Sequence, residues 1–218
     1  MTTVATVRLL VGEGSGRGWG TPVQDEQELL AQVATGDEEA LHQLYLAYRP
    51  RLYRYLWHQL NGEAHSIEEA LQDVFLAVWR SAGRYRAEAR VSTWIYQIAH
   101  HVALDTHRRL AKHTGNVRFE SRDHAEEDPP DWLDAASMAC DDRVLDRLAL
   151  GDAFDRLSLK HREVLALIFQ QGFSPDEAAQ IMGVATGTIR SRISYARKAL
   201  WRELYTTTPA KEMRHDAS

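Results

Sequence analysis

The amino-acid sequence predicts an all-α fold of two small helical domains joined by a flexible acidic linker. Apolar residues recur three and four positions apart across residues 25–112 and again after residue 142, which is the period of amphipathic helices. No stretch alternates at period two for long enough to indicate a β-sheet. Between the two helical parts, residues 113–140 lose this periodicity and include Pro129 and Pro130, which predicts a linker.

The expected domain boundaries follow from these changes of pattern. Alternating glycines from Gly12 to Gly20 indicate a flexible N-terminal tail. We therefore expect an N-terminal tail at residues 1–24 and a first domain at residues 25–112. An acidic linker is expected at residues 113–141, a second domain at 142–205 and a C-terminal tail at 206–218.

In the first domain, each expected helix has its own start and stop signals. A short helix over residues 28–33 is ended by Gly36, and Asp37 is expected to cap the next helix. Pro50 suits the first turn of a third helix, because its missing N–H is not needed there. Gly62 then provides a plausible end for that helix.

The most regular helix of this domain comes next. Ser66 and Glu69 have the spacing of a capping box. Gly83 ends this helix, and Ser92 or Thr93 is expected to start a long helix with basic residues in its last turns. The stripe expected to face the core consists of Ile67, Ala70, Leu71, Val74, Phe75, Val78 and Trp79.

The second domain ends in the pattern of a helix-turn-helix. A helix capped by Ser158 comes first. Ser174 and Glu177 then have capping-box spacing, with a proline at the first helical position between them. Gly183 permits a sharp turn, and Thr186 is expected to cap the second helix of the motif.

That second helix has two distinct faces. Its inward face consists of Ile189, Ile193, Ala196 and Leu200. Its outward face consists of Thr188, Ser191, Arg192, Tyr195, Lys198 and Arg202. Hydroxyl and guanidinium groups near the start of a helix suit contacts with base edges in the major groove, and later basic residues suit contacts with phosphates. The motif therefore predicts DNA binding.

The formal net charge of −5 conceals a segregation of charge along the chain. Residues 84–113 carry six basic residues against two acidic ones, and residues 188–202 carry five basic residues and no acidic one. Acidic residues dominate residues 25–80 and 120–143. Two basic segments separated by an acidic one favour two nucleic-acid contacts, although charge alone leaves ordinary solvated faces as an alternative.

Several other classes of protein lack support in the sequence. No apolar run is long enough to cross a bilayer, the N-terminus lacks the pattern of a secretory signal, and Cys140 has no second cysteine to pair with. These features suit a cytoplasmic protein without membrane insertion. No glycine-rich phosphate loop or pairing of a nucleophile with a base indicates an enzyme, and no cofactor is expected.

Two other classes of regulatory protein are alternatives for this sequence. A metal-responsive regulator is suggested by the histidines, but His100 and His107 lie two helical turns apart, which is too far for one ion, so no metal site is expected. A two-component response regulator would need an α/β receiver domain, whereas residues 25–112 have a helical pattern.

Three parts of the chain resemble the extracytoplasmic-function (ECF) group of the sigma-70 family. The matching segments are Ser66–Trp79, then Val91–Ala99 followed by Ala103–Asp105 and Arg108-Arg109, and finally Gly183–Leu200. Their order, with a linker between the last two, makes the resemblance specific. It implies an RNA polymerase sigma factor with a region 2 helical bundle and a region 4 helix-turn-helix.

The resemblance also implies a role for each segment. Contacts with a coiled coil of the core polymerase β′ subunit are implied for Glu69, Gln72, Asp73 and Leu76. Recognition of the −10 element and promoter melting are implied for Arg84, Tyr85, Arg86, Arg90, Tyr96, His100, His101, Arg108 and Arg109. Binding of the −35 element is implied for Thr188, Arg190, Ser191, Arg192, Tyr195, Lys198 and Arg202. Cationic groups and flat side chains in the second set suit a single DNA strand.

The expected function is transcription initiation for a stress- or signal-response regulon. The expected partners are core RNA polymerase, through its β′ and β subunits, promoter DNA, and an anti-sigma factor that covers the same surfaces. In this family the acidic linker runs through the polymerase active-site cleft and the RNA exit path, and a disordered solubilising tether is the alternative for this segment.

Overall fold

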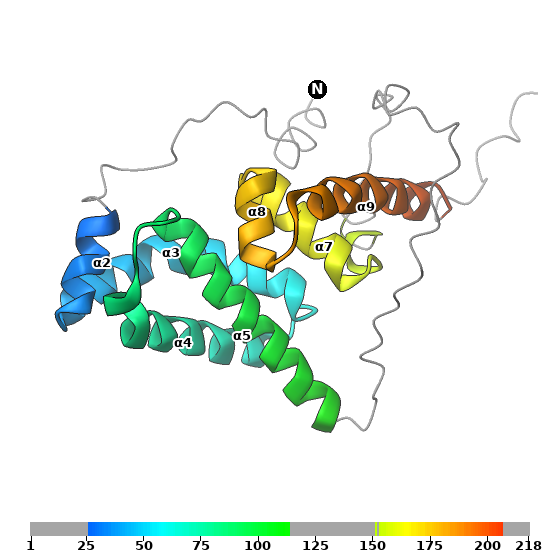
Figure 1. The fold of residues 1–218 in the computed structure, drawn as a ribbon. Coiled ribbons are helices and arrows are strands. Elements are labelled where there is room, and N and C mark those ends of the chain that lie inside the picture. The colour runs from blue at the N-terminus through cyan, green and yellow to red at the C-terminus, as the bar shows by residue number, and fades with distance from the viewer. Residues whose placement is uncertain (1–25, 114–150, 152, 207–218) are drawn as a thin grey trace, which may run out of the picture.

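A computed structural model describes residues 26–113, 151 and 153–206, and these residues form helices with no strand among them (Figure 1). The predicted all-α class is confirmed. Residues 1–25, 114–150, 152 and 207–218 lie outside the described residues, and with them nearly all of the predicted tails and linker.

The N-terminal half of the fold is a helical bundle. Its elements are α2 (Glu26–Ala34), α3 (Glu38–Gln59), α4 (Ala64–Ser81), the short 3-10 helix η1 (Ala82–Arg84) and α5 (Val91–His113). The stripe predicted on α4 is confirmed as core, because its members are buried except for the half-buried Trp79. Contacts of α3, α4 and α5 with one another form the centre of this bundle.

Helix α3 passes through Pro50 without a break, so the prediction of a new helix there is wrong. The cap at its start is confirmed, since Asp37 Oδ1 accepts hydrogen bonds from the backbone N–H groups of Glu39 (2.9 Å) and Ala40 (3.1 Å). A proline in a helix interior costs about 3 kcal/mol. Burial along one face of the whole helix offsets this cost, and the buried residues are Ala40, Leu44, Tyr48, Leu52, Tyr55, Leu56 and Gln59.

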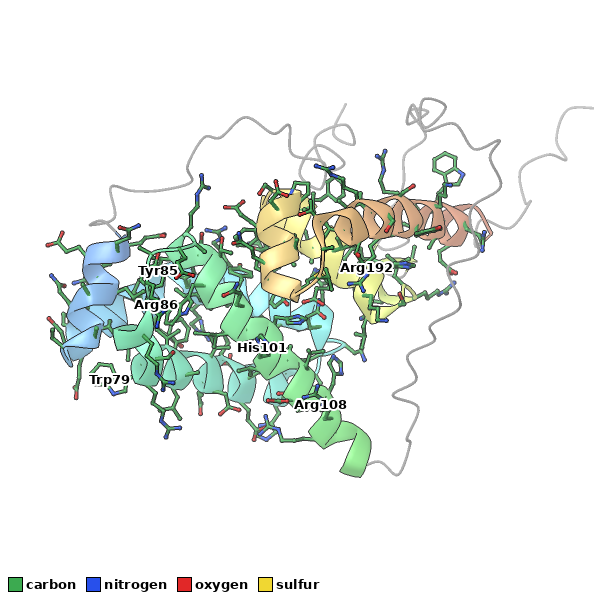
Figure 2. The ribbon with its side chains drawn as sticks, in the orientation of Figure 1. Trp79, Tyr85, Arg86, His101, Arg108 and Arg192 are labelled. Carbon is green, nitrogen blue, oxygen red and sulfur yellow. The ribbon has the colours of Figure 1, made fainter. Side chains whose placement is uncertain are left out.

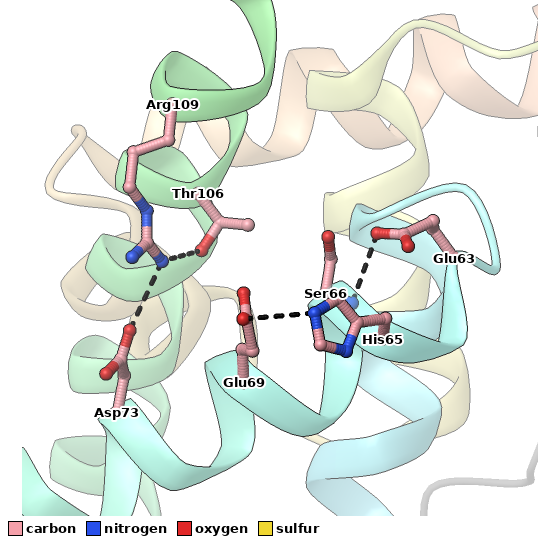
Figure 3. Close-up of polar contacts among 7 residues, drawn as sticks. All are labelled: Glu63, His65, Ser66, Glu69, Asp73, Thr106 and Arg109. Atoms are coloured by element: carbon pink, nitrogen blue, oxygen red, sulfur yellow. Dashed lines mark hydrogen bonds and ion pairs between the residues drawn. The ribbon is translucent and has the colours of Figure 1, made fainter. Parts of the chain in front are cut away.

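The start of α4 also differs from the prediction. The helix begins at Ala64 and is capped by Glu63, whose Oε2 accepts from the backbone N–H of Ser66 at 3.1 Å. The predicted capping box of Ser66 and Glu69 is therefore wrong. Glu69 instead pairs with His65, one turn earlier, at 3.2 Å (Figure 3).

The C-terminal half contains the helix-turn-helix. Its elements are α7 (Leu159–Leu165), the π-helical η3 (Ala166–Gln170), α8 (Pro175–Met182) and α9 (Thr186–Thr206). Ser158 caps α7 as predicted. The capping box at the start of α8 is confirmed, with Ser174 Oγ accepting from Glu177 N at 3.2 Å and Glu177 Oε2 accepting from Ser174 N at 2.9 Å. Gly183 has φ of +64°, which allows the turn between α8 and α9.

Thr186 does not cap α9, contrary to the prediction. The helix already includes Thr186, and its hydroxyl donates to Asp176 Oδ1 at 2.8 Å. Ala185 precedes the helix, and its carbonyl accepts from Ile189 N at 3.2 Å. The threonine therefore joins α9 to the start of α8, which fixes the angle between the two helices of the motif.

The two halves pack directly against each other (Figure 1). Helix α8 lies against α5, and α7 lies against α3. The contact is partly apolar, since the rings of Tyr96 and Phe173 meet edge to face with centroids 4.8 Å apart. The sequence pattern predicts two separate domains and does not predict this contact.

Candidate polymerase and nucleic-acid interfaces

The recognition helix α9 presents a different exposed stripe from the one expected. The inward face is confirmed, with Ile189 and Ala196 fully buried and Ile193 and Leu200 half-buried against the core. Of the residues predicted to contact DNA, Arg190 and Arg202 are exposed. The others are half-buried, namely Thr188, Ser191, Arg192, Tyr195 and Lys198. The most exposed stripe consists of Arg190, Ser194, Arg197 and Trp201.

The packing of α9 explains why its exposed stripe differs from the predicted one. The helix contacts both α7 and α8, so it is covered over a wider arc than the apolar stripe alone indicates. Ser191 Oγ donates to the backbone carbonyl of Thr188 at 3.0 Å. Sequence reasoning missed Ser194, Arg197 and Trp201 as outward residues, although their i, i+4, i+7 spacing with Arg190 was a usable signal.

The predicted docking residues lie together on α4, outside the core. Gln72 is exposed, and Leu76 is 45% exposed, which is high for a large apolar side chain. Asp73 Oδ2 pairs with Arg109 Nη2 of α5 at 3.2 Å, and the same arginine nitrogen donates to Thr106 Oγ1 at 3.0 Å (Figure 3). The ion pair joins a residue expected to bind polymerase to one expected to contact DNA.

A surface hollow of about 550 Å³ lies beside this face, between α4 and α5. Its lining includes Asp73, Leu76, Arg80, Arg84, Val102 and Arg109. A lining that combines apolar side chains with charges of both signs suits a protein–protein contact.

Most of the predicted −10 set is open to solvent. The exposed members are Arg84, Arg86, Arg90, His101, Arg108 and Arg109. Arg108 pairs with Asp105 at 2.6 Å, and Arg90 lies 3.5 Å from Glu177 of α8. Figure 2 shows Arg86 beside the N-terminal end of α5, with His101 and Arg108 farther along that helix.

Aromatic and basic side chains meet in a cleft of about 430 Å³ beside the start of α5. Tyr85 and Trp94 lie with ring centroids 5.5 Å apart, and the Tyr85 hydroxyl donates to the carbonyl of Ala89 at 2.6 Å. The cleft is lined by Arg84, Tyr85, Arg86, Glu88, Ala89, Trp94, Gln97 and Gln180. Trp94 is half-buried, and it both packs against the core and lines this cleft.

Two members of the predicted −10 set are instead buried between the halves. The Tyr96 hydroxyl donates to Gln171 Oε1 at 2.7 Å, and His100 Nδ1 lies 2.6 Å from Glu163 Oε1. The hydroxyl of Tyr55 donates to the same carboxylate oxygen at 2.5 Å. Burial raises the pKa of both tyrosines well above the ordinary value, so both remain hydrogen-bond donors. In this arrangement neither Tyr96 nor His100 faces a nucleic acid.

Sequence reasoning missed Glu163 and Gln171 as members of this contact. Glu163 is the last of four polar or charged residues, Lys160–Glu163, that directly precede the buried Val164 and Leu165. Its position therefore gave no local signal, because the residues that Glu163 contacts lie far away in the sequence.

Two further findings apply to the described part of the chain. It contains no group of three or more histidine, cysteine or acidic residues arranged to hold a metal ion. None of its helices combines the length and the apolar character that a bilayer crossing requires.

Comparisons with known proteins agree with this geometry. Residues 44–113 match the family described as Sigma-70 region 2, and residues 147–200 match Sigma-70, region 4. The chain therefore belongs to the sigma-70 family of RNA polymerase sigma factors, in its ECF group. Over 183 residues it is 31% identical to the ECF RNA polymerase sigma factor SigM of Mycobacterium tuberculosis, covering 83% of this chain and 85% of the relative.

Two solved structures have a similar fold. CnrH in complex with the cytosolic domain of CnrY has a TM-score of 0.60 at 20% identity, covering 85% of this chain and 100% of that one. The sigma factor RpoE in complex with the anti-sigma factor NepR from Bartonella quintana has a TM-score of 0.57 at 23% identity, covering 76% of this chain and 97% of that one. We refer below to residues 44–113 as region 2 and to residues 147–200 as region 4.

Proposed function

We propose that this sigma factor binds core RNA polymerase through the exposed face of α4, contacts the −35 element with α9, and recognises and opens the −10 element with α5 and residues 84–90. It does so in the cytoplasm, for a stress- or signal-response regulon. The two functional domains are those at residues 25–112 and 142–205. The observation that carries the proposal is that one chain combines both sigma regions with exposed basic groups on α5 and α9.

Docking on polymerase is supported by the chemistry of the α4 face. Leu76 is an exposed apolar side chain beside the acidic Glu69 and Asp73. Such a face suits a helical partner that offers an apolar groove with basic residues at its edge, because burial of Leu76 supplies affinity and the charges supply orientation.

DNA binding by α9 is supported by its exposed cations. Arg190, Arg197 and Arg202 are exposed, and residues 188–202 contain no acidic side chain. Each arginine that neutralises a phosphate releases counterions, so binding is expected to weaken steeply with added salt. Base recognition falls to the first turns of the helix, where Thr188 and Arg192 lie.

Promoter melting is supported by the cleft at the start of α5. Tyr85 and Trp94 offer flat rings, and Arg84 and Arg86 of the same lining offer cations. This combination is what a protein needs to hold unpaired bases and their backbone.

Control by an anti-sigma factor is also part of the proposal. The similar RpoE structure was solved with the anti-sigma factor NepR. In the present chain, exposed apolar side chains on α3 and α4, such as Leu46, Trp57 and Leu76, offer surface for such a partner.

Run-off transcription with purified core polymerase and a genomic promoter library tests the proposal. We expect discrete transcripts only when the core enzyme and this chain are both present. Transcripts that core enzyme yields alone, or DNA binding by this chain with no transcript in the combined reaction, would contradict it. The second outcome would instead indicate an ordinary repressor or activator.

A further inference from the structure

The segment that joins η1 to α5 contains an unusual backbone conformation. Ala87 has φ of +55°, in the left-handed region. An alanine is disfavoured there, because its Cβ lies close to the following carbonyl oxygen, so the conformation persists only where surrounding contacts hold it. Among the described residues, Asn61 is the one other non-glycine residue with positive φ, and asparagine tolerates this region better. The backbone of Ala87 therefore needs a structural reason.

A side chain next to Ala87 supplies that reason. The Tyr85 hydroxyl donates to the backbone carbonyl of Ala89 at 2.6 Å, so it bridges the residues on either side of Ala87. The Tyr85 ring packs against Trp94 in the first turn of α5, with ring centroids 5.5 Å apart. The Tyr85 backbone N–H also donates to the carbonyl of Ala82 in η1 at 3.1 Å. Both ends of the turn are thus fixed to neighbouring elements.

We call residues 85–90 the tethered loop, and this loop supplies much of the lining of the aromatic and basic cleft. Arg86 and Glu88 directly flank Ala87 in the chain, and both line the cleft, with Arg86 at the start of α5 (Figure 2). Ala87 is exposed and lies outside that lining. Because its φ sets the directions in which its two neighbours leave the loop, Ala87 acts on a ligand in the cleft through them.

A loop that is ordered before binding has an advantage in affinity. Each residue that becomes fixed on binding loses conformational entropy, and this loss is subtracted from the gain of the new contacts. A turn that is already held in the free protein has lost this entropy on folding. The hydroxyl of Tyr85 and the turn at Ala87 should therefore strengthen the binding of a ligand that contacts Arg84 and Arg86, although neither group has to touch it.

We propose that Ala87 and Tyr85 are positioning residues for the unpaired −10 strand. The left-handed turn at Ala87, held by the Tyr85 hydroxyl, forms the tethered loop before DNA binds and fixes Arg86 at the cleft. This inference rests on the proposed function, because it uses the assignment of the cleft to unpaired −10 bases. The Tyr85 hydroxyl acts inside the protein, whereas the ring lines the cleft, so substitutions can separate the two roles.

Substitution at residue 85 separates the hydroxyl from the ring. The probe is a fluorescein-labelled single-stranded oligonucleotide with the −10 element of a promoter found by the library assay, and anisotropy follows its binding to core polymerase that carries this chain. We expect Tyr85→Phe, which keeps the ring, to weaken binding about fivefold. The matched control is Tyr53→Phe, another half-buried tyrosine packed against a tryptophan, which should leave binding unchanged. Equal binding by Tyr85→Phe and the unmodified chain would overturn the role of the hydroxyl.

Substitutions at residue 87 test the turn itself. Ala87→Asn introduces a residue that tolerates the left-handed region, and Ala87→Val introduces a β-branched residue that does not. We expect the asparagine variant to bind the oligonucleotide within about twofold of the unmodified chain, and the valine variant about tenfold more weakly. Ala47→Val, at an exposed position of α3, is the control for added bulk and should leave binding unchanged. Equal binding by the asparagine and valine variants would overturn the role of Ala87.

A measurement on the free chain separates failure of this inference from failure of the proposed function. Millisecond hydrogen exchange of the backbone amides of residues 86–90 needs neither polymerase nor DNA. We expect exchange to be about fivefold faster in Tyr85→Phe and Ala87→Val, with an unchanged thermal unfolding midpoint. If polymerase with the unmodified chain does not bind the oligonucleotide, the proposed function fails, and the exchange rates still decide whether these residues hold the loop. If it binds and both variants bind equally well, only the further inference fails.

Discussion

Two carboxylates contact α5, and they differ in exposure, since Asp73 lies at the surface and Glu163 in the interior. Asp73 pairs with Arg109 at 3.2 Å where both side chains are about half exposed, whereas Glu163 lies with His100 and Tyr55 in the buried contact between the regions. An exposed pair contributes at most about 1 kcal/mol and exchanges readily with water or a partner. A buried carboxylate is costly to leave unpaired, so its partners are fixed. Exposed groups of this chain should therefore act on partners, and buried ones on its conformation.

The largest effect is expected when the buried carboxylate is removed. Glu163→Ala leaves the Tyr55 hydroxyl and His100 without their acceptor, and loss of one partner from a buried pair costs about 3–5 kcal/mol. This loss in the free energy of unfolding cannot exceed the free energy that holds the two regions together, because separation of the regions exposes the unpaired groups to water. Urea titration followed by circular dichroism measures it. The matched Asp73→Ala should cost less than about 1 kcal/mol, and equal losses for both variants would break the comparison.

A partly exposed arginine on α9 should act on DNA and not on stability. Arg192→Ala is expected to weaken binding to a −35 duplex by about 1–3 kcal/mol, the range for a base contact made by two hydrogen bonds. Fluorescence anisotropy against the promoter duplex measures this loss, and a scrambled duplex shows whether it is specific. Arg197→Ala, on the more exposed stripe, is the matched control and should weaken both duplexes alike. If Arg192→Ala binds both duplexes as the unmodified chain does, the assignment of Arg192 is wrong.

Reversal of the exposed carboxylate should act on polymerase. Asp73→Arg is expected to reduce affinity for core enzyme about tenfold, or ~1.4 kcal/mol, while the thermal unfolding midpoint stays nearly unchanged. Competition for core enzyme with the unmodified chain measures it, with Glu38→Arg on α3 as the control for charge.

The charge-swapped pair Asp73→Arg with Arg109→Asp sharpens this test. It restores the internal ion pair but not the acidic docking face. Affinity that stays low in the double variant supports docking by Asp73, and affinity that returns shows that the internal pair is what matters.

The difference between contacts within one helical turn and contacts between distant helices explains what the sequence predicts and what it does not. Caps such as Asp37 and Ser174 depend on residues within one turn, so local pattern is sufficient to place them. The errors at Pro50 and Thr186 arise because packing with distant helices outweighs a local signal. Local pattern identifies the helices, their apolar faces and the family motifs.

The placement of site residues divides along similar lines. The α4 face is exposed as its pattern indicates, because its apolar stripe alone decides its orientation. Burial of His100 depends on Glu163, which lies 63 residues away in the chain, and burial of Tyr96 depends on Gln171, which lies 75 residues away. No periodicity reports a contact of that separation, so the packing of the two regions against each other emerges only from the structure.

The smallest expected effect concerns a half-buried histidine ring at the contact between the regions. His58 of α3 meets Phe154 edge to face at 4.8 Å, and its Nδ1 is buried with no hydrogen-bond partner among the described residues. Burial lowers the pKa of His58 below its usual 6.5, and the nearby Asp155 only partly opposes this. The folded chain thus binds fewer protons than the unfolded chain once the pH falls toward 6.5 and below. Stability present at pH 7.5 is therefore lost as the pH drops through that range.

His58→Phe keeps the ring contact and removes the titration, so its thermal midpoint should fall less than that of the unmodified chain between pH 7.5 and 5.5. Differential scanning calorimetry at both pH values measures the difference. The exposed His42→Gln serves as the control and should follow the unmodified chain. Parallel falls in all three proteins would show that His58 is not charged on unfolding in this range. The acid sensitivity would then belong to other groups, such as His107, whose pKa burial also lowers.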